Sequence, residues 1–148
     1  MTADRICKAK YPNNDGEGAR LHGGRWNHKG TPMIYCGQTA SLAALEVLAN
    51  SAGLPSNMVI IQAHIPDLVR IKKLEKSDLP GDWGGAVPSN STKDIGTNWA
   101  ASMETAVLSV PSAIVGRERN ILINPRRPDF RSVTFSAPEP FHFDPRLK

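Results

Sequence analysis

Apolar positions along the chain gather in short runs separated by turn residues, and this pattern predicts several short strands. NMVIIQAHI (residues 57–65) shows the strongest strand pattern, and VRIKKL (69–74) is its expected partner. The other strand-like runs are DRICKA (4–9), PMIYCG (32–37), AVLSVPSAIV (106–115), NILINP (120–125) and VTFSAPEPFHF (133–143).

Two segments have a helical pattern instead. TASLAALEVLANSAG (39–53) has Thr39 or Ser41 near its N-cap and Gly53 past its end, and KDIGTNWAASMET (93–105) is expected to start near Asp94 or Thr97. Residues 11–30 and 75–92 are dense in turn residues and are expected to be loops. Two helices among several strands, without regular strand–helix alternation, predict one α+β domain over residues 1–148 with a mixed or antiparallel sheet.

Composition narrows the class of protein. The chain has 148 residues, 40% hydrophobic and 22% charged, which is ordinary for a globular domain. Its net charge of +4 favours anionic partners, but the basic residues are scattered, which favours a solvated basic surface. Neither the two cysteines nor the four histidines form a metal-ligand pattern. We expect a cytoplasmic protein, because no signal segment or membrane-spanning apolar run is present.

The first candidate for chemistry is Glu46, which lies inside the apolar helical run. Leu42, Leu45 and Ala49 fall within about 100° of it on the helix surface. A carboxylate in such surroundings is either buried with a partner or directed into a cleft. The structural alternative is a buried ion pair, or an exposed exception to the apolar pattern.

Three further residues are weaker signals on their own. Arg25 follows Gly23 and Gly24, which permit positive φ and close approach of a ligand, and its guanidinium suits phosphate or carboxylate. Gly-Gly-Arg is nevertheless common in ordinary turns. Tyr35, near a strand end, could line a cleft or belong to the core. Ser112 interrupts an apolar strand, where a hydroxyl often satisfies only a backbone group.

The order of these signals resembles the RES-domain family, the toxins of RES–Xre toxin–antitoxin pairs. The resemblance rests on five blocks in the family's order: DRI (4–6), GEGARLHGGRWNHKGTPMIYCGQTASLAALEVL (16–48), DIGTNWAAS (94–102), AVLSVPSAIVGRERNILINPRRPDF (106–130) and PFHFDPRL (140–147). It implies a fold similar to that of the ADP-ribosyltransferase toxins. It also implies that NAD+ is consumed as a substrate, with no separate cofactor.

The resemblance implies specific roles as well. The family's catalytic arginine, tyrosine, glutamate and serine match Arg25, Tyr35, Glu46 and Ser112. Glu46 would stabilise positive charge on the ribose, Arg25 would hold the phosphates or the ribose side of the cleft, and Tyr35 would stack on nicotinamide. Ser112 would donate to the nicotinamide amide or orient Glu46. The expected substrate-binding residues are Gly24, Arg25, Trp26, Tyr35 and Ser112.

The resemblance also implies a partner. An Xre-type antitoxin with a helix-turn-helix domain would form a hetero-oligomer with the chain, occlude the active site and provide the only contact with DNA. The acceptor of the ADP-ribosyl group stays open among water, phosphate and a protein side chain. Two other classes compete: a basic nucleic-acid-binding module or toxin ribonuclease, suggested by GGRWNHK (23–29), and a non-catalytic interaction domain.

Overall fold

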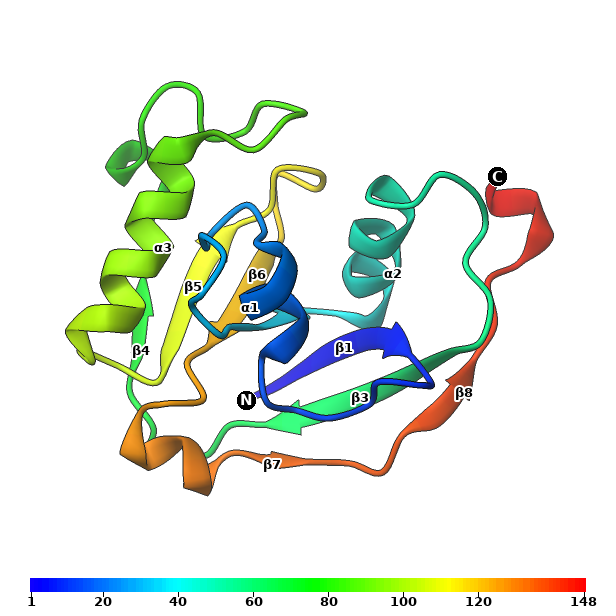
Figure 1. Cartoon of the computed structure of the whole chain (residues 1–148), viewed down its shortest axis with the longest axis horizontal. Helices are drawn as coiled ribbons and strands as arrows, with labels where there is room; N and C mark the ends of the chain where they lie inside the picture. The colour runs from blue at the N-terminus through cyan, green and yellow to red at the C-terminus, as the bar shows by residue number, and fades with distance from the viewer.

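The computed structural model describes all residues 1–148 and shows eight strands in one mixed sheet, accompanied by three α-helices (Figure 1). The predicted α+β class with a mixed sheet is therefore confirmed. The strands are β1 (Thr2–Lys8), β2 (Ile34–Gly37), β3 (Met58–His64), β4 (Ile71–Lys73), β5 (Val107–Pro111), β6 (Arg119–Ile123), β7 (Thr134–Phe135) and β8 (Glu139–Phe141). The helices are α1 (Glu17–His22), α2 (Ala40–Ala49) and α3 (Asn90–Ser102), with short 3-10 turns at Lys76–Asp78, Pro128–Ser132 and Pro145–Leu147.

The sheet bends between two halves. Its order is β4-β5-β6-β2-β1-β3-β7, with β8 also on β3, and only β4 and β5 pair in parallel. Strands β1 and β2 share a single residue pair, Asp4 opposite Gly37, whereas β1 and β3 share seven. This thin junction lets β5 and β6 run up the view of Figure 1 while β1 and β3 run across it. One face of both halves contributes to a core cluster that includes Ala3, Ile34, Ala63 and Ile123.

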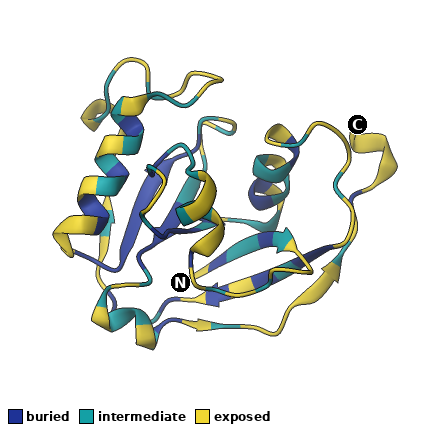
Figure 2. Ribbon diagram, in the orientation of Figure 1, coloured by how far each residue is buried: buried dark blue, intermediate teal, exposed yellow.

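The other face of the sheet carries the helices. Helix α2 packs Ala43 and Leu48 on Ile6 and Met58, and α3 packs Trp99 among side chains of β5 and β6. Helices α2 and α3 therefore stand on opposite sides of the β6 region, with α1 between them in the view (Figure 1). Figure 2 shows that burial is concentrated in β5, β6 and the sheet-facing sides of the helices.

Helix α2 is capped at its start by Thr39, one of the two predicted caps. The Thr39 hydroxyl accepts a hydrogen bond from the backbone N–H of Leu42 at 3.1 Å, as an N-cap does. The helix ends at Asn50, before the predicted Gly53. Its outer surface leaves the apolar Leu45 39% exposed.

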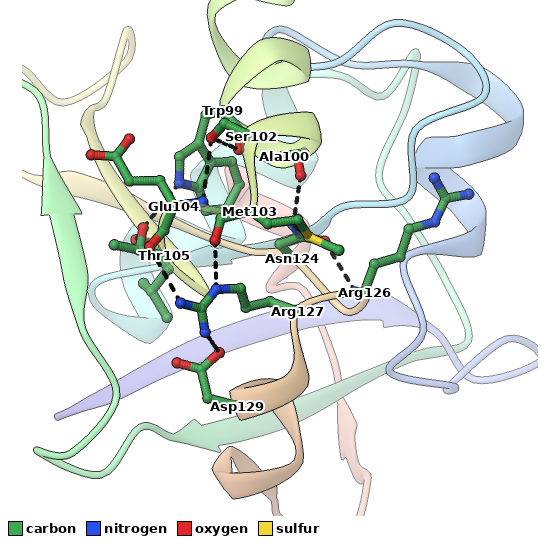
Figure 3. A network of polar contacts seen from close by, with 11 residues as sticks. Trp99, Ala100, Ser102, Met103, Glu104, Thr105, Asn124, Arg126, Arg127 and Asp129 are labelled. Atoms are coloured by element: carbon green, nitrogen blue, oxygen red, sulfur yellow. Dashed lines mark hydrogen bonds and ion pairs between the residues drawn. The ribbon is translucent and has the colours of Figure 1, made fainter.

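Helix α3 begins at Asn90 after Ser89, about one turn before the predicted start. Its final carbonyls are satisfied from the segment after β6: Asn124 donates to the Ala100 carbonyl at 3.0 Å, and Arg127 donates to the Met103 carbonyl at 2.6 Å (Figure 3). A basic side chain there also complements the helix dipole. These bonds fix α3 to the sheet.

Three expectations about the elements were wrong. Residues 11–30 contain α1, a six-residue helix with a glycine on either side of its first residue and no buried position, so no apolar periodicity marked it. The run 69–74 pairs with β5 rather than with β3, because β1, β7 and β8 already occupy the edges of β3. The last run is two strands, with Pro138 in the stretch between β7 and β8.

Helix α3 approaches the loop before β2 most closely at a glycine. A Cβ on Gly96 would lie 1.8 Å from the Trp26 carbonyl oxygen, which is backbone and has no rotamer to move away. The close approach of α3 therefore requires glycine at this position.

We expect Gly96→Ala to lower the free energy of unfolding by about 2 kcal/mol or more, since overpacking forces the backbone to shift. Gly18→Ala is the matched control: it also lies in a helix, and nothing stands within 4 Å of the added Cβ. The control should be neutral or slightly stabilising because alanine favours helix. Chemical denaturation of both variants measures the difference, and near-wild-type stability of Gly96→Ala would contradict this packing.

Candidate active site

Glu46 projects from α2 toward the β5–β6 hairpin. Its Oε1 atom accepts hydrogen bonds from the Ser112 hydroxyl at 3.1 Å and from the Asn120 side-chain amide at 2.6 Å. No side chain donates to Oε2, which is not among the buried polar atoms without a partner, so this oxygen remains open to solvent. The carboxylate is thus fixed by one oxygen and free at the other.

Neither Glu46 nor Arg25 belongs to any ion pair of the structure. The alternative of a buried ion pair between them is therefore excluded. Glu46 is held by neutral donors, which orient a carboxylate without neutralising it.

Ser112 is 1% exposed and uses its hydroxyl fully. The oxygen accepts from the backbone N–H groups of Ile114 and Val115, both at 3.0 Å, while its hydrogen goes to Glu46. Of its two predicted roles, the geometry matches orientation of Glu46. A direct bond to a substrate amide would require this hydroxyl to leave Glu46.

Tyr35 lies on β2 and fastens the loop that precedes the strand. Its hydroxyl donates to Asn27 Oδ1 at 2.6 Å and accepts from the Trp26 backbone N–H at 3.1 Å. Asn27, fully buried, donates in turn to the carbonyls of Ala19, His28 and Thr31. One buried amide therefore ties the tyrosine to three points of the loop.

Burial raises the pKa of Tyr35 well above its ordinary value, although the Trp26 N–H and the Arg25 charge act in the opposite direction. The phenol is therefore neutral at physiological pH and cannot serve as a base. The half-buried ring is what Tyr35 can offer a ligand.

Arg25 is half-buried, next to this anchored segment. Its Nη1 donates to the Trp83 carbonyl at 2.9 Å, and that bond connects it with the turn-rich segment before α3. No acceptor in the chain is bonded to Nε or Nη2. These two nitrogens form the edge of a guanidinium that grips phosphate or carboxylate with two parallel bonds.

The sheet register shows how Tyr35 lies relative to Asn120, the residue that binds Glu46. Tyr35 and Gly37 are alternate residues on β2, and Gly37 pairs with Asn120 of β6. Tyr35 and Asn120 therefore share one face, about 7 Å apart along the strand. The four predicted catalytic residues thus form two clusters on this face: Glu46 with Ser112, and Tyr35 with Arg25, whose charge acts on the phenol.

Two predicted substrate-binding residues have structural roles instead. Trp26 is 1% exposed and belongs to the core cluster under α3, so its ring is not available to a ligand. A Cβ on Gly24 would lie 2.7 Å from the Tyr35 hydroxyl oxygen, so this glycine admits the tyrosine rather than a ligand. Gly23 has a φ of 72°, as a glycine pair permits.

Sequence reasoning missed Asn27 and Asn120. Asn120 opens a strand-like run, where an amide resembles an ordinary polar end, and Asn27 lies in a loop rich in polar residues. The only signal available was their place within the blocks that carry the family resemblance. Asn120 became visible through its contact with the distant Glu46, and Asn27 through the folding of its loop around one buried amide.

The structure contains no group of three or more histidine, cysteine or acidic side chains arranged to hold a metal ion. Among its helices, none has both the length and the apolar character needed to cross a membrane.

Comparison with known proteins places the chain in a family. A family model described as "RES domain" matches residues 2–144. The chain is 36% identical over 136 residues to "Prs ADP-ribosylating toxin" of Sphingobium sp. strain YBL2, covering 89% of this chain and 84% of the relative. It is 41% identical over 136 residues to "Toxin Res" of Yersinia enterocolitica, covering 90% and 89%.

The fold also has a solved counterpart. A chain of the crystal structure of the M. tuberculosis MbcT–MbcA toxin–antitoxin complex superimposes with a TM-score of 0.75 and 19% identity. The match covers 99% of this chain and 86% of that chain. At this identity the likeness establishes the fold.

A titration tests the enclosed Tyr35 hydroxyl. The folded state raises the pKa of Tyr35, so the stability it contributes is fully present below about pH 10, the value in an unfolded chain, and is lost as pH rises toward the folded pKa. In a Tyr11→Phe variant, Tyr35 is the sole tyrosine. Phenolate absorbance should then appear only together with alkaline unfolding, followed by circular dichroism. Ionisation near pH 10 in a still-folded protein would contradict the buried hydrogen bonds.

Proposed function

This chain belongs to the RES-domain family of toxins, and we propose that it cleaves the nicotinamide–ribose bond of NAD+. The observation that carries the proposal is the Glu46 carboxylate, fixed through Oε1 by Ser112 and Asn120 and open at Oε2. The free edge of Arg25 supports it on the same face of the sheet.

The reaction needs little acid–base chemistry. The carbon–nitrogen bond breaks with both electrons going to the nicotinamide nitrogen, and nicotinamide leaves neutral. Positive charge develops on the ribose, as in glycosidic cleavage. An acceptor then supplies an electron pair to the anomeric carbon, and the proton that the acceptor carried is released to solvent. A preorganised carboxylate lowers the energy of that transition state. Glu46 Oε2, directed at the ribose, would play this part.

Arg25 supplies the complementary charge. Its Nε and Nη2 atoms have no acceptor in the chain and suit the pyrophosphate of NAD+, while the bond from Nη1 to Trp83 fixes the guanidinium plane. The Tyr35 ring would stack on nicotinamide. Ser112 and Asn120 act through Glu46 as positioning residues.

The acceptor determines the class of reaction. Water gives a glycohydrolase, phosphate a phosphorylase, and a protein side chain an ADP-ribosyltransferase. A relative 36% identical to this chain is named an ADP-ribosylating toxin, which supports transfer to protein among these outcomes. The chain would act in the cytoplasm, where NAD+ is abundant.

An enzyme that consumes NAD+ must be restrained in its own cell, and a solved neighbour is part of a toxin–antitoxin complex. The partner proposed here is an Xre-type antitoxin with a helix-turn-helix domain. It would cover the free edge of Arg25 with a carboxylate, either from a side chain or from its chain terminus. It would also provide the only contact with DNA.

We expect Glu46→Gln to reduce NAD+ turnover by about a hundredfold or more, because it keeps the shape of the side chain and removes its charge. Glu139→Gln, on an exposed position of β8, is the matched control and should retain activity. Chromatography of the products, with and without phosphate and a cell extract, also identifies the acceptor. Full activity in Glu46→Gln would refute the role. Growth arrest with an unchanged NAD+ pool would instead support the ribonuclease alternative.

Arg25→Ala should weaken the complex with the antitoxin about tenfold or more, because it leaves the partner's carboxylate buried and unpaired. Calorimetry of the purified partners measures the affinity, and NAD+ turnover of the wild-type complex measures occlusion. Lys29 is an exposed cation in the same loop, so Lys29→Ala tests whether the loss of any positive charge there weakens the complex. A stable wild-type complex that consumes NAD+ at the free rate would disprove occlusion.

A further inference from the structure

A hollow of about 480 Å³ lies beside the β5–β6 hairpin, and none of its lining residues is hydrophobic. Its charged residues come from the end of β4, the 3-10 turn after it with its cap, the hairpin turn and the start of β6. They are the cations Lys73, Lys76, Arg117 and Arg119 and the carboxylates Glu75 and Glu118.

The Arg119 side of the hollow and the candidate active site lie on opposite faces of the hairpin, while the Glu118 carboxylate accepts a hydrogen bond from Thr39 at the start of α2. Arg119 pairs with Pro111 across β5 and β6, and both line the hollow. Side chains alternate along a strand, so Asn120, which holds Glu46, points to the other face. A ligand bound to Arg119 would therefore leave Glu46 uncovered.

Arg119 is a fixed cation in this hollow. Its Nε donates to the Ser109 hydroxyl at 2.7 Å, and its Nη2 donates to the carbonyls of Ser109 and Leu74. The remaining nitrogen, Nη1, makes no hydrogen bond and lies 3.5 Å from a Glu75 oxygen. With a side chain only 20% exposed, this guanidinium is held in place before any ligand arrives.

Two other cations have no partner. Neither the Lys76 ammonium nor the Arg117 guanidinium takes part in a hydrogen bond or ion pair, whereas Lys73 pairs with Glu75 at 3.2 Å. The Lys76 nitrogen lies 3.2 Å from where a Cβ on Gly116 would stand, so it rests against the hairpin turn. Four cations against two carboxylates leave the hollow with a charge of +2.

We propose that this hollow binds a small ligand carrying two or more phosphate groups, separately from the NAD+ site. Guanidinium and ammonium groups are the usual partners of phosphate oxygens. The volume of the hollow falls within the range of small-molecule pockets. It is larger than one inorganic phosphate needs. The lack of hydrophobic lining argues against a peptide, because protein interfaces depend on apolar and aromatic anchors.

Pyrophosphate is the probe, titrated into the whole chain in phosphate-free buffer and followed by amide NMR shifts and calorimetry. The largest shifts should fall on Lys76, Ser77, Gly116 and Arg117. The double variant Lys76→Ala/Arg117→Ala should weaken binding about tenfold or more, since two charge contacts are lost. Binding should also weaken as ionic strength rises.

Two controls distinguish binding in the hollow from non-specific attraction to positive charge and from binding at the NAD+ site. Arg126→Ala/Arg131→Ala removes two exposed arginines elsewhere, and Figure 3 shows Arg126 directed away from its neighbours. Arg25→Ala removes the phosphate-binding group proposed for NAD+. Pyrophosphate binding unchanged in both controls supports the hollow. Loss in Arg25→Ala, equal loss in the Arg126/Arg131 pair, or no saturable binding to the wild-type chain would overturn it, whatever the outcome for NAD+ cleavage.

Discussion

The partial burial of one carboxylate is the constraint on which this site depends. Glu46 lies on a helix whose other side chains, apart from Ser41, are apolar, and removing a charge from water is costly unless donors replace the lost hydration. The Ser112 hydroxyl and the Asn120 amide supply two hydrogen bonds to one oxygen. Those donors belong to the hairpin turn and β6, so α2 and the hairpin must stay in register for the carboxylate to be satisfied. The same requirement leaves the second oxygen exposed in a defined direction.

A second buried polar group orders the opposite side of the site. Asn27 accepts from Tyr35 and donates to three carbonyls, which converts a glycine-rich loop into a rigid support for Arg25. Two glycines allow the close contacts that this arrangement requires. Gly24 lies against the Tyr35 hydroxyl, and Gly96 of α3 lies against the Trp26 carbonyl. The serine and the tyrosine thus use their hydroxyl groups on the protein itself. Arg25 and Glu46 are the groups with bonding capacity left for a ligand.

The β5–β6 hairpin connects two surfaces of different chemistry. Adjacent residues of one strand, Arg119 and Asn120, point to opposite faces, one into a basic hollow and the other toward Glu46. The turn between the strands contains Ser112 at one end and Arg117 near the other. Its internal bonds, from the Ile114 and Val115 N–H groups to Ser112 and from the Ser112 N–H to the Glu118 carbonyl, make it a single rigid unit.

Local pattern in the sequence was enough to determine the mixed α+β class, most strands and both longer helices, and to narrow the α2 cap to Thr39 or Ser41, because periodicity and capping are short-range effects. Family resemblance singled out Arg25, Tyr35, Glu46 and Ser112, which the fold then arranged as two clusters on one face. Only the tertiary structure decided that β4 joins β5, that Trp26 is core, and that Asn27 and Asn120 are hydrogen-bonding centres. The physical reason is that an amide's partners depend on the folded path of the chain. Asn120 meets Glu46 across 74 residues, and Asn27 meets its partners only once its irregular loop has closed around it.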